Sequence, residues 1–279
     1  QMCIRDRPGS VVAFRPPARD GISPRKVMLN GIVPASHTYV AGEAGDSAFS
    51  PGTVLEPGIE LPGPTLAWYH PDVPAEEPIP FDYSVLYADS DLIVADKPHF
   101  LPTTSNGRLV RETLQTRLRV DFGEEDIVPL HRLDRLTAGL VLCSRNPHTR
   151  GAYQRLFQDR AVAKHYQARL TAPLFYDGTV RVGMRRERGE RQILVDPAGT
   201  PTVTRLHAQG MLADVYPLTG HTHQIRVVLN HLGHPIVGDD TYPVDRGLDL
   251  YDFSTPLQLE HVALSLRDPF TGRTRRFSR

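Results

Sequence analysis

The sequence predicts an α+β fold: a mixed, mostly antiparallel central sheet with flanking helices, plus a small N-terminal strand and loop appendage. Strand-like segments outnumber those with helical spacing, and the two kinds do not alternate as they would in a parallel βαβ sheet. With 279 residues, of which 40% are hydrophobic, the chain is long enough for one large domain with a sizeable core and a small appendage.

We expect the appendage and a linker over residues 1–80 and the main domain over 81–279. Residues 1–7 (QMCIRDR) resemble the translation of a sequencing-adapter end, so we leave them out of the fold argument. Residues 8–80 are rich in Pro and Gly around short strand-like pieces such as KVMLNGIV. The segment PDVPAEEPIPF has the composition of a proline-rich linker.

The main domain contains alternating runs, helical runs and turn residues in a clear order. The expected elements are two strands around an Asp-Ser-Asp turn (84–98), a helix (109–123), a loop and buried strand (128–146), a helix (148–160), a strand (163–172), a hairpin turning at Gln209-Gly210 (202–220), a helix (221–233) and a strand-turn-strand unit (257–277).

The formal net charge is zero, but the charges are unevenly distributed. Residues 131–191 carry 13 Lys and Arg against 5 Asp and Glu, whereas residues 81–130 carry 5 against 9. A basic zone of this kind is typical of a surface that binds a polyanion such as nucleic acid, with Arg185 and Arg186 in RVGMRRERGER as candidate contacts. Charge alone favours a solvated arginine-rich face equally well.

The stretch PLHRLDRLTAGLVLCSRNP places Asp134 between Arg132 and Arg135. Neighbouring guanidinium groups keep a carboxylate ionised, which suits a nucleophile or a base and does not suit a general acid. Taken alone, the stretch fits a structural aspartate in a surface loop better than a catalytic one.

Two further segments carry polar residues on a defined face. A helix starting near His221 would place His223, Arg226 and Asn230 on one side, which makes Arg226 a candidate partner for a buried carboxylate. In KHYQARL, strand alternation places Lys164 and Tyr166 on the same face. A tyrosine facing a cleft is a stacking platform for a base, whereas a lone tyrosine is more often a core residue.

Metal, cofactor and membrane signals are absent from the sequence. Four histidines cluster at residues 221, 223, 231 and 234, but no helical pair has the i, i+4 spacing of zinc-binding helices. There is no Gly-rich phosphate loop and no nucleophile elbow, so we expect no cofactor. No long apolar run or signal peptide is visible, and the two cysteines lie far apart, which predicts a cytoplasmic protein.

Four segments together resemble the RluA-type RNA pseudouridine synthases. HRLDRLTAGLVL resembles their His-Arg-Leu-Asp signature, DLIVADKPHFLPTT their Lys-Pro motif and KHYQARL their Lys-x-Tyr motif. GHTHQIRVVLNHLGHPIVGDDTYP resembles their Arg-Thr-His-Gln-Ile-Arg motif and the residues that follow it. The order and spacing agree from about Phe81 to the end of the chain, which is far more specific than any one motif.

The resemblance implies a catalytic cleft with Asp134 as the catalytic aspartate, Tyr166 beneath the target base and Arg226 as the partner of Asp134. Arg132 would help to displace the target nucleotide from the RNA stack. The other residues expected to face RNA are His131, Arg135, His223 and Gln224. Asp134 would act on the ribose of a flipped-out uridine, either at C1′ or on the C2′ proton. The expected partner is tRNA or rRNA, and the expected state is a monomer without cofactor or membrane contact.

The chain departs from the family pattern at three places. Thr137-Ala138-Gly139 replaces Thr-Ser-Gly, a change between small residues. His221 replaces an arginine and so removes a permanent charge. Leu259-Glu260-His261 stands where many members have Leu-His-Ala.

Three other functions are compatible with parts of the sequence. A non-catalytic RNA-binding protein could share the fold, although the residues of the catalytic signature are intact. A metal-dependent hydrolase would use the histidine cluster. A glycosidase would require a second carboxylate acting as an acid, for which Glu260 is the candidate.

Overall fold

The computed structural model describes residues 14–44, 47–105 and 107–279. Residues 1–7, including Cys3, lie outside this part of the chain. The chain divides into two compact units, Gln1–Ala75 and Glu76–Arg279, so the boundary falls inside the proline-rich segment and not at residue 80. Glu76 belongs to the second unit because its carboxylate accepts hydrogen bonds from the backbone N–H groups of Val110, Arg111 and Glu112.

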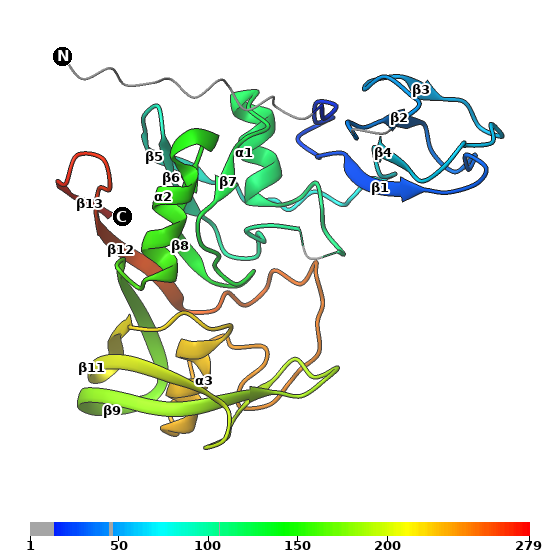
Figure 1. The fold of residues 1–279 in the computed structure, drawn as a ribbon. Helices are drawn as coiled ribbons and strands as arrows, with labels where there is room; N and C mark the ends of the chain where they lie inside the picture. Colours follow the sequence, from blue (N-terminus) through cyan, green and yellow to red (C-terminus); the bar gives the residue numbers. More distant parts are fainter. Residues whose placement is uncertain (1–13, 45–46, 106) are drawn as a thin grey trace, which may run out of the picture. The chain divides into compact units, whose positions relative to one another are not determined.

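The first unit contains a small antiparallel sheet in the order β1-β4-β2-β3 (Figure 1). Its strands are β1 (Arg25–Leu29), β2 (Tyr39–Ala41), β3 (Val54–Leu55) and β4 (Thr65–Tyr69). Alternating residues of these strands, such as Leu29, Tyr39, Leu55 and Ala67, form a separate buried cluster. The unit therefore has a core of its own, as an appended strand-and-loop domain requires.

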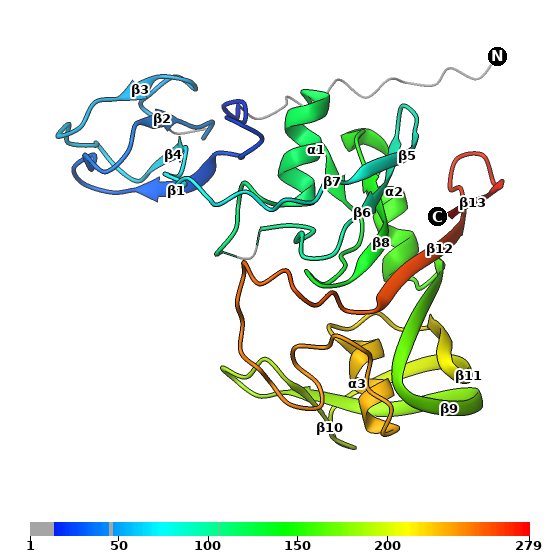
Figure 2. The same ribbon diagram turned by 180° about the vertical axis from the view of Figure 1, so that it is seen from behind.

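The second unit is built on a nine-stranded sheet with the path β10-β9-β12-β8-β6-β5 (Figures 1 and 2). Its strands are β5 (Ser84–Ala88), β6 (Leu92–Lys97), β7 (Val128–Pro129), β8 (Ala138–Ser144), β9 (Ala163–Arg186), β10 (Ile193–Val195), β11 (Thr200–Pro217), β12 (Leu259–Arg267) and β13 (Thr274–Ser278). Strands β11, β13 and β7 pair with β9, β12 and β8. Only the β12–β8 pair is parallel among the described strands, which confirms the predicted mixed, mostly antiparallel sheet.

Three helices flank this sheet: α1 (Leu114–Phe122), α2 (Pro147–Gln158) and α3 (Gln224–His231). The side chains of Thr113 and Asn146 cap the N-termini of α1 and α2, and Gly123 in a left-handed conformation ends α1. Helix α3 starts after His223, which has a φ of 57°, and packs against β11 and β10. All three helices lie where the sequence predicts them, each shorter than the predicted range.

The predicted hairpin over residues 202–220 is wrong. Strand β11 runs continuously from Thr200 to Pro217 and pairs along its length with β9. Gly210, with a φ of 69°, lies at a register shift: the two steps from Gly210 to Leu212 on β11 face the five steps from Leu174 back to Arg169 on β9. The extra residues are therefore on β9, and Gly210 marks an irregularity in the pairing and not a turn. The reversal of the chain comes earlier, between β9 and β11, around the short strand β10.

The main core lies on the sheet surface that also carries the site described below. All seven residues of β8 are buried, and Val141 and Cys143 pack in one cluster with Tyr166 of β9 and Ile225 of α3. Cys143 is a free thiol, and burial raises its pKa to about 12, so it is an unreactive core residue. Among the described helices, none is long and apolar enough to cross a membrane.

Candidate active site

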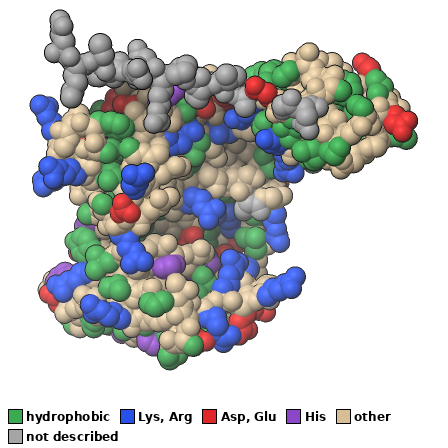
Figure 3. Space-filling view, viewed as in Figure 1, with side chains coloured by type: hydrophobic (Ala, Val, Ile, Leu, Met, Phe, Trp, Pro, Cys, Tyr) green, Lys and Arg blue, Asp and Glu red, His purple; other side chains and the backbone are tan. Residues whose placement is uncertain are grey.

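A cleft of about 1160 Å³ opens in the second unit, lined by the loop before β8, the start of β9 and the start of α3. Figure 3 shows it as a hollow with Lys and Arg side chains along its edges. Eight of the ten residues selected from the sequence line it: His131, Arg132, Asp134, Arg135, Tyr166, His223, Gln224 and Arg226. Arg185 and Arg186 are not among the lining residues.

Hydrogen bonds from Lys97 and Thr103 hold the backbone of the loop that carries Asp134. The fully buried Lys97 ammonium group donates to the carbonyls of Pro98, Leu101 and Arg135 at 2.8, 2.8 and 3.3 Å. Thr103 donates to the Leu133 carbonyl and accepts from the Leu133 N–H. Burial lowers the pKa of Lys97 to about 7, and the negative charge of Asp134 acts against that shift.

Asp134 faces two basic side chains of the α3 segment. Its Oδ2 atom lies 3.6 Å from Nη1 of Arg226 and 3.9 Å from Nε2 of His223, and its side chain is 30% exposed. Burial lowers the pKa of His223 against the pull of Asp134, and its Nδ1 shares a 3.2 Å hydrogen bond with the Tyr242 hydroxyl. The permanent positive charge beside Asp134 is therefore that of Arg226.

Arg226 has a closer partner than the expected Asp134. Its buried guanidinium, 3% exposed, donates to both oxygens of Asp239 at 2.8 and 2.6 Å and to Asp240 at 2.9 Å. Asp239 also accepts from the N–H groups of Thr241 and Tyr242. Because Asp239 holds Arg226 by two parallel hydrogen bonds, Arg226 presents only its remaining Nη1 edge to Asp134.

Tyr166 forms part of the cleft wall from β9 and is 8% exposed. Burial and the nearby charge of Asp134 both raise its pKa, which keeps the phenol protonated. Its ring is stacked on the imidazole of His261, with the ring centroids 4.4 Å apart and the planes inclined by 15°. The sequence analysis assigned no role to His261 or Asp239: Asp239 lies in a segment that carries the resemblance, and His261 lies at a departure from it.

Three cations at the cleft wall have no internal partner. Arg132, Arg160 and Lys164 line the cleft, and none of their side chains forms a hydrogen bond or ion pair within the part of the chain that the structure describes. Arg132 and Arg160 are exposed, and Lys164 is half-buried on the same strand face as Tyr166. These charges are available to RNA phosphates.

Three residues expected to face RNA have internal partners. Arg135 donates to the backbone carbonyls of Leu250 and Asp249. His131 accepts the Leu142 N–H at Nε2, and burial holds its pKa well below the usual value, so it carries no charge for a phosphate. The Gln224 amide accepts from Thr219 and the His221 N–H and donates to Val203 and Thr204, which ties α3 to β11.

Two arginines of RVGMRRERGER, Arg185 and Arg186, are also internally paired. Arg185 contacts Asp196 at 2.5 Å and Glu187 at 3.4 Å, and Arg186 donates to the Glu190 carbonyl. Neither residue lines the cleft. The predicted RNA contacts of Arg185 and Arg186 therefore lie outside the cleft and stay predictions.

Asp134 is the single carboxylate among the described residues that line the cleft. Glu260, the second carboxylate that a glycosidase would need, pairs with Arg279 at 2.7 Å and lies 3.8 Å from His99 outside this lining. Among the described residues no group of three His, Cys, Asp or Glu side chains is placed to hold a metal ion. The site thus brings together one carboxylate, one fixed guanidinium and a stacked tyrosine.

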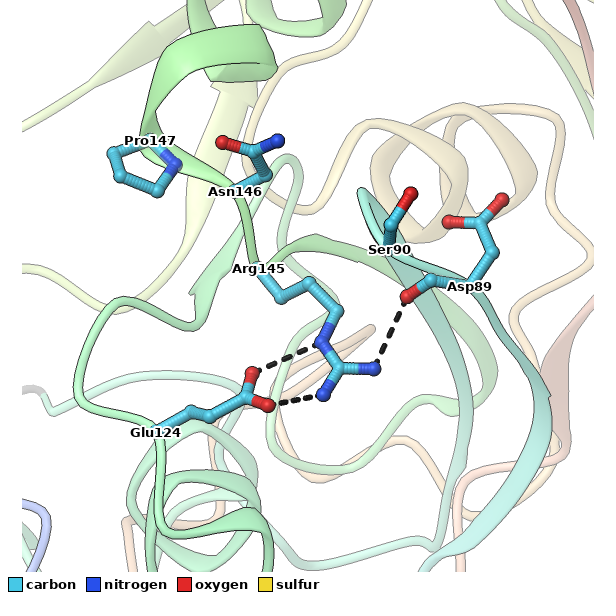
Figure 4. A pocket seen from close by; sticks show the side chains of 6 residues that line it. All are labelled: Asp89, Ser90, Glu124, Arg145, Asn146 and Pro147. Carbon is cyan, nitrogen blue, oxygen red and sulfur yellow. Dashed lines mark hydrogen bonds and ion pairs between the residues drawn. The ribbon is translucent and has the colours of Figure 1, made fainter.

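A second, shallow hollow lies on the surface between β5 and the start of α2 (Figure 4). Arg145 occupies it and donates to both carboxylate oxygens of Glu124 and to the Asp89 carbonyl. The guanidinium is satisfied within the protein, so this hollow offers no free charge to a ligand.

Comparison with known proteins places the chain in a family. The family model described as RNA pseudouridylate synthase matches residues 91–231. The dual-specificity RNA pseudouridine synthase RluA of Vibrio cholerae is 32% identical over 195 residues, which cover 66% of this chain and 77% of that protein. RNA pseudouridine synthase 5 of Arabidopsis thaliana is 29% identical over 237 residues, which cover 71% of this chain and 63% of that protein.

Other relatives are longer. The mouse pseudouridylate synthase RPUSD2 is 34% identical over 194 residues, and the match spans only 32% of its length. The chain therefore spans less than two thirds of the length of several curated relatives.

Solved structures show the same fold. Human RNA pseudouridylate synthase domain containing 1 superposes with a TM-score of 0.58 at 24% identity, over 71% of this chain and 83% of that one. Human RNA pseudouridylate synthase domain containing 4 gives a TM-score of 0.53 at 23% identity, over 70% and 87%. With the family match over half of its residues and the RluA relative covered over most of its length, this chain belongs to the RNA pseudouridylate synthase family, and within it to the RluA type.

Proposed function

We propose that this protein isomerises uridine to pseudouridine at specific positions of a structured tRNA or rRNA. The observation that carries the proposal is the lone carboxylate of Asp134, held in the cleft between Arg226 and the wall formed by Tyr166. Relatives named a tRNA pseudouridine(31) synthase in yeast and a ribosomal large subunit pseudouridine synthase D in Haemophilus influenzae support both RNA classes.

The reaction breaks the bond between ribose C1′ and uracil N1, turns the detached base and joins C1′ to C5, after which C5 loses its proton and N1 gains one. No atom is gained or lost overall, so the protein needs to supply positioning and charge and no co-substrate. Asp134 acts on the ribose of the flipped-out nucleotide, either by attack at C1′ or by removal of the C2′ proton. Arg226 lies 3.6 Å from that carboxylate and supplies the neighbouring positive charge.

Tyr166 supplies a flat wall against which the uracil stacks while it is detached. Its raised pKa keeps the hydroxyl protonated, so in the resting site it acts as a hydrogen-bond donor and not as a base. Arg132, Arg160 and Lys164 neutralise the phosphates that flank the extruded nucleotide. His223 completes the wall on the α3 side and lies 3.9 Å from Asp134.

A cytoplasmic location, a monomeric state and the absence of a cofactor stay predictions.

The test is to map pseudouridines in tRNA and rRNA from cells with and without the gene, and then in the same RNAs treated with the purified protein. We expect one or a few positions to lose the modification in the deletion strain and to regain it with wild-type protein but not with Asp134→Asn. If no position changes in either RNA class, the proposed function is wrong.

A further inference from the structure

His261 connects the two strands that carry the candidate catalytic residues. Strand β12 lies between β9, which holds Tyr166, and β8, which follows directly from the Asp134 loop. In the sheet, His261 is the register partner of Tyr166 on one side and of Gly139 on the other. Directly opposed residues of paired strands extend on the same face, so the imidazole and the phenol ring meet.

The His261 side chain contacts both neighbouring strands at once. Its Nδ1 atom donates to the Leu140 carbonyl of β8 at 2.6 Å, since a carbonyl can only accept. Its ring lies nearly parallel to Tyr166 of β9, with 4.4 Å between centroids. The residue is fully buried, so both contacts are shielded from water.

The backbone leaves His261 no room to shift toward β8. Gly139 has a φ of 111°, and a Cβ atom at this position would lie 2.3 Å from the His261 carbonyl oxygen and 2.6 Å from its nitrogen. Glycine therefore allows a close approach of the two strands that no other residue would permit. The spacing from the Asp134 loop through Gly139 and His261 to Tyr166 is set by direct contacts.

The other ring nitrogen of His261, Nε2, makes no hydrogen bond among the described residues. With the proton on Nδ1, Nε2 is an acceptor, and it is buried without a hydrogen-bond partner among the described residues. An unpaired buried acceptor costs free energy that an apolar side chain would avoid. Ring shape and the single hydrogen bond to β8 are what this residue provides at that cost.

We propose that His261 is a positioning residue, which fixes the plane of the Tyr166 ring relative to Asp134 by bridging β9 and β8. This inference rests on the proposed isomerase function of the cleft. By this role His261 does not touch RNA. It acts through Tyr166, and its removal lets the phenol ring rotate and tilt beneath the substrate base.

The test compares three variants with the wild-type protein. His261→Leu keeps much of the volume but removes the ring, and His261→Phe keeps the ring but removes the hydrogen bond. His37→Leu is the control, because His37 also packs against a tyrosine, Tyr69, with 4.5 Å between the ring centroids, but both residues belong to the first unit and neither lines the cleft.

In single-turnover isomerisation we expect His261→Leu to lower the maximal rate by about tenfold or more through misplacement of Tyr166. The RNA concentration for half-maximal rate should change by less than about twofold, because no phosphate contact is altered. His261→Phe should retain most of the rate, and His37→Leu should match the wild type. A folded His261→Leu variant with an unchanged rate, or one impaired only in RNA affinity, would overturn the proposal.

A second measurement does not depend on activity. In protein labelled at tyrosine, the rate at which the Tyr166 ring flips is read by NMR, with its signals assigned from Tyr166→Phe. We expect slow flipping in the wild type and in His261→Phe and fast flipping in His261→Leu. Equal flipping in all three overturns the positioning role, whereas the expected contrast in a protein without isomerase activity refutes only the proposed function. If His261→Leu does not fold, His261→Gln serves as the ring-free variant.

Discussion

Asp134 lies beside the positive charge of Arg226 and remains open to solvent. Arg226 approaches one oxygen at 3.6 Å while the carboxylate stays 30% exposed, so a substrate can displace solvent and reach it. The two arginines adjacent to Asp134 in the sequence are not its ion-pair partners. Arg132 is exposed at the cleft, and Arg135 donates to backbone carbonyls. The charge partner comes from a distant helix.

The burial of His261 predicts how the stability of the fold depends on pH. Burial lowers its pKa to about 4, against about 6.5 in an unfolded chain. Between about pH 6.5 and about pH 4 the imidazole of His261 is protonated in the unfolded chain and neutral in the folded chain. The free energy of unfolding is therefore unaffected by this group above about pH 6.5 and decreases as the pH falls towards 4.

His261→Phe removes this proton and should flatten the acid limb of the stability curve by up to about 1.4 kcal/mol per pH unit in that window. Urea unfolding of both proteins at pH 7, 5.5 and 4.5 measures it. Curves that stay parallel over the whole range would mean that His261 is not held neutral by burial.

At the scale of elements, Arg226 is locked to the loop after α3, and a mutant cycle can measure how strongly. Arg226→Met leaves Asp239 buried without its partner, which should cost about 3–5 kcal/mol of unfolding free energy. Adding Asp239→Asn should recover a substantial part of that loss, whereas adding Asp134→Asn should recover less because Asp134 is partly solvated.

The measurement is the coupling energy of each pair from equilibrium unfolding at neutral pH. A stronger coupling of Arg226 to Asp134 than to Asp239 would contradict the geometry described here and restore the pairing expected from the sequence.

Lys97 tests how the Asp134 loop is held. Lys97→Met leaves three carbonyls without their donor, including that of Arg135, and should cost about 1–3 kcal/mol of stability at neutral pH. The single-turnover rate should also fall under conditions where the variant is fully folded, because the loop is no longer held and the position of Asp134 becomes variable. Thermal melts and single-turnover rates at a temperature where both proteins are folded test this, and an unchanged rate would show that Lys97 serves the fold alone.

Sequence patterns predicted the strands and the principal cleft residues because both follow from local rules. Alternation marks the start of β9, a buried apolar run marks β8, and the signature segments place Asp134, Tyr166 and Arg226 in one cleft. The prediction at Gly210 was wrong because a glycine between two alternating runs gives the same signal for a hairpin turn and for a pairing irregularity within one strand.

Long-range partners could not be predicted in this way. The contact between His261 and Tyr166 depends on which strands become neighbours, and the choice of Asp239 over Asp134 by Arg226 depends on the path of a loop. The inward orientation of Gln224 follows from its position against β11, which no periodicity in α3 indicates.

At the scale of the whole molecule, the net charge is neutral but the arginines are of two kinds, those paired within the fold and those that face the cleft. Many pair within the fold, as Arg185 does with Asp196, whereas Arg132 and Arg160 face the cleft without partners among the described residues. RNA binding should therefore depend on the arginines that face the cleft, Arg132 and Arg160.

Arg132→Gln combined with Arg160→Gln should weaken RNA binding and lower the slope of log Kd against log salt by up to about two. The matched double variant Arg185→Gln with Arg186→Gln should leave the slope nearly unchanged. Filter binding over a range of salt concentrations measures both. The opposite ranking would place the RNA on the β9–β10 surface and not at the cleft.

The central claim is that the Asp134 carboxylate carries out uridine isomerisation in this cleft. Pseudouridine formation releases the hydrogen at C5, so RNA transcripts labelled with tritium at C5 of uridine report each turnover as tritiated water. We predict release by the wild-type protein from tRNA or rRNA, and loss of release in Asp134→Asn by at least about a thousandfold with melting temperature and RNA affinity nearly unchanged. Tritium release by Asp134→Asn at a rate close to that of the wild type would contradict the account.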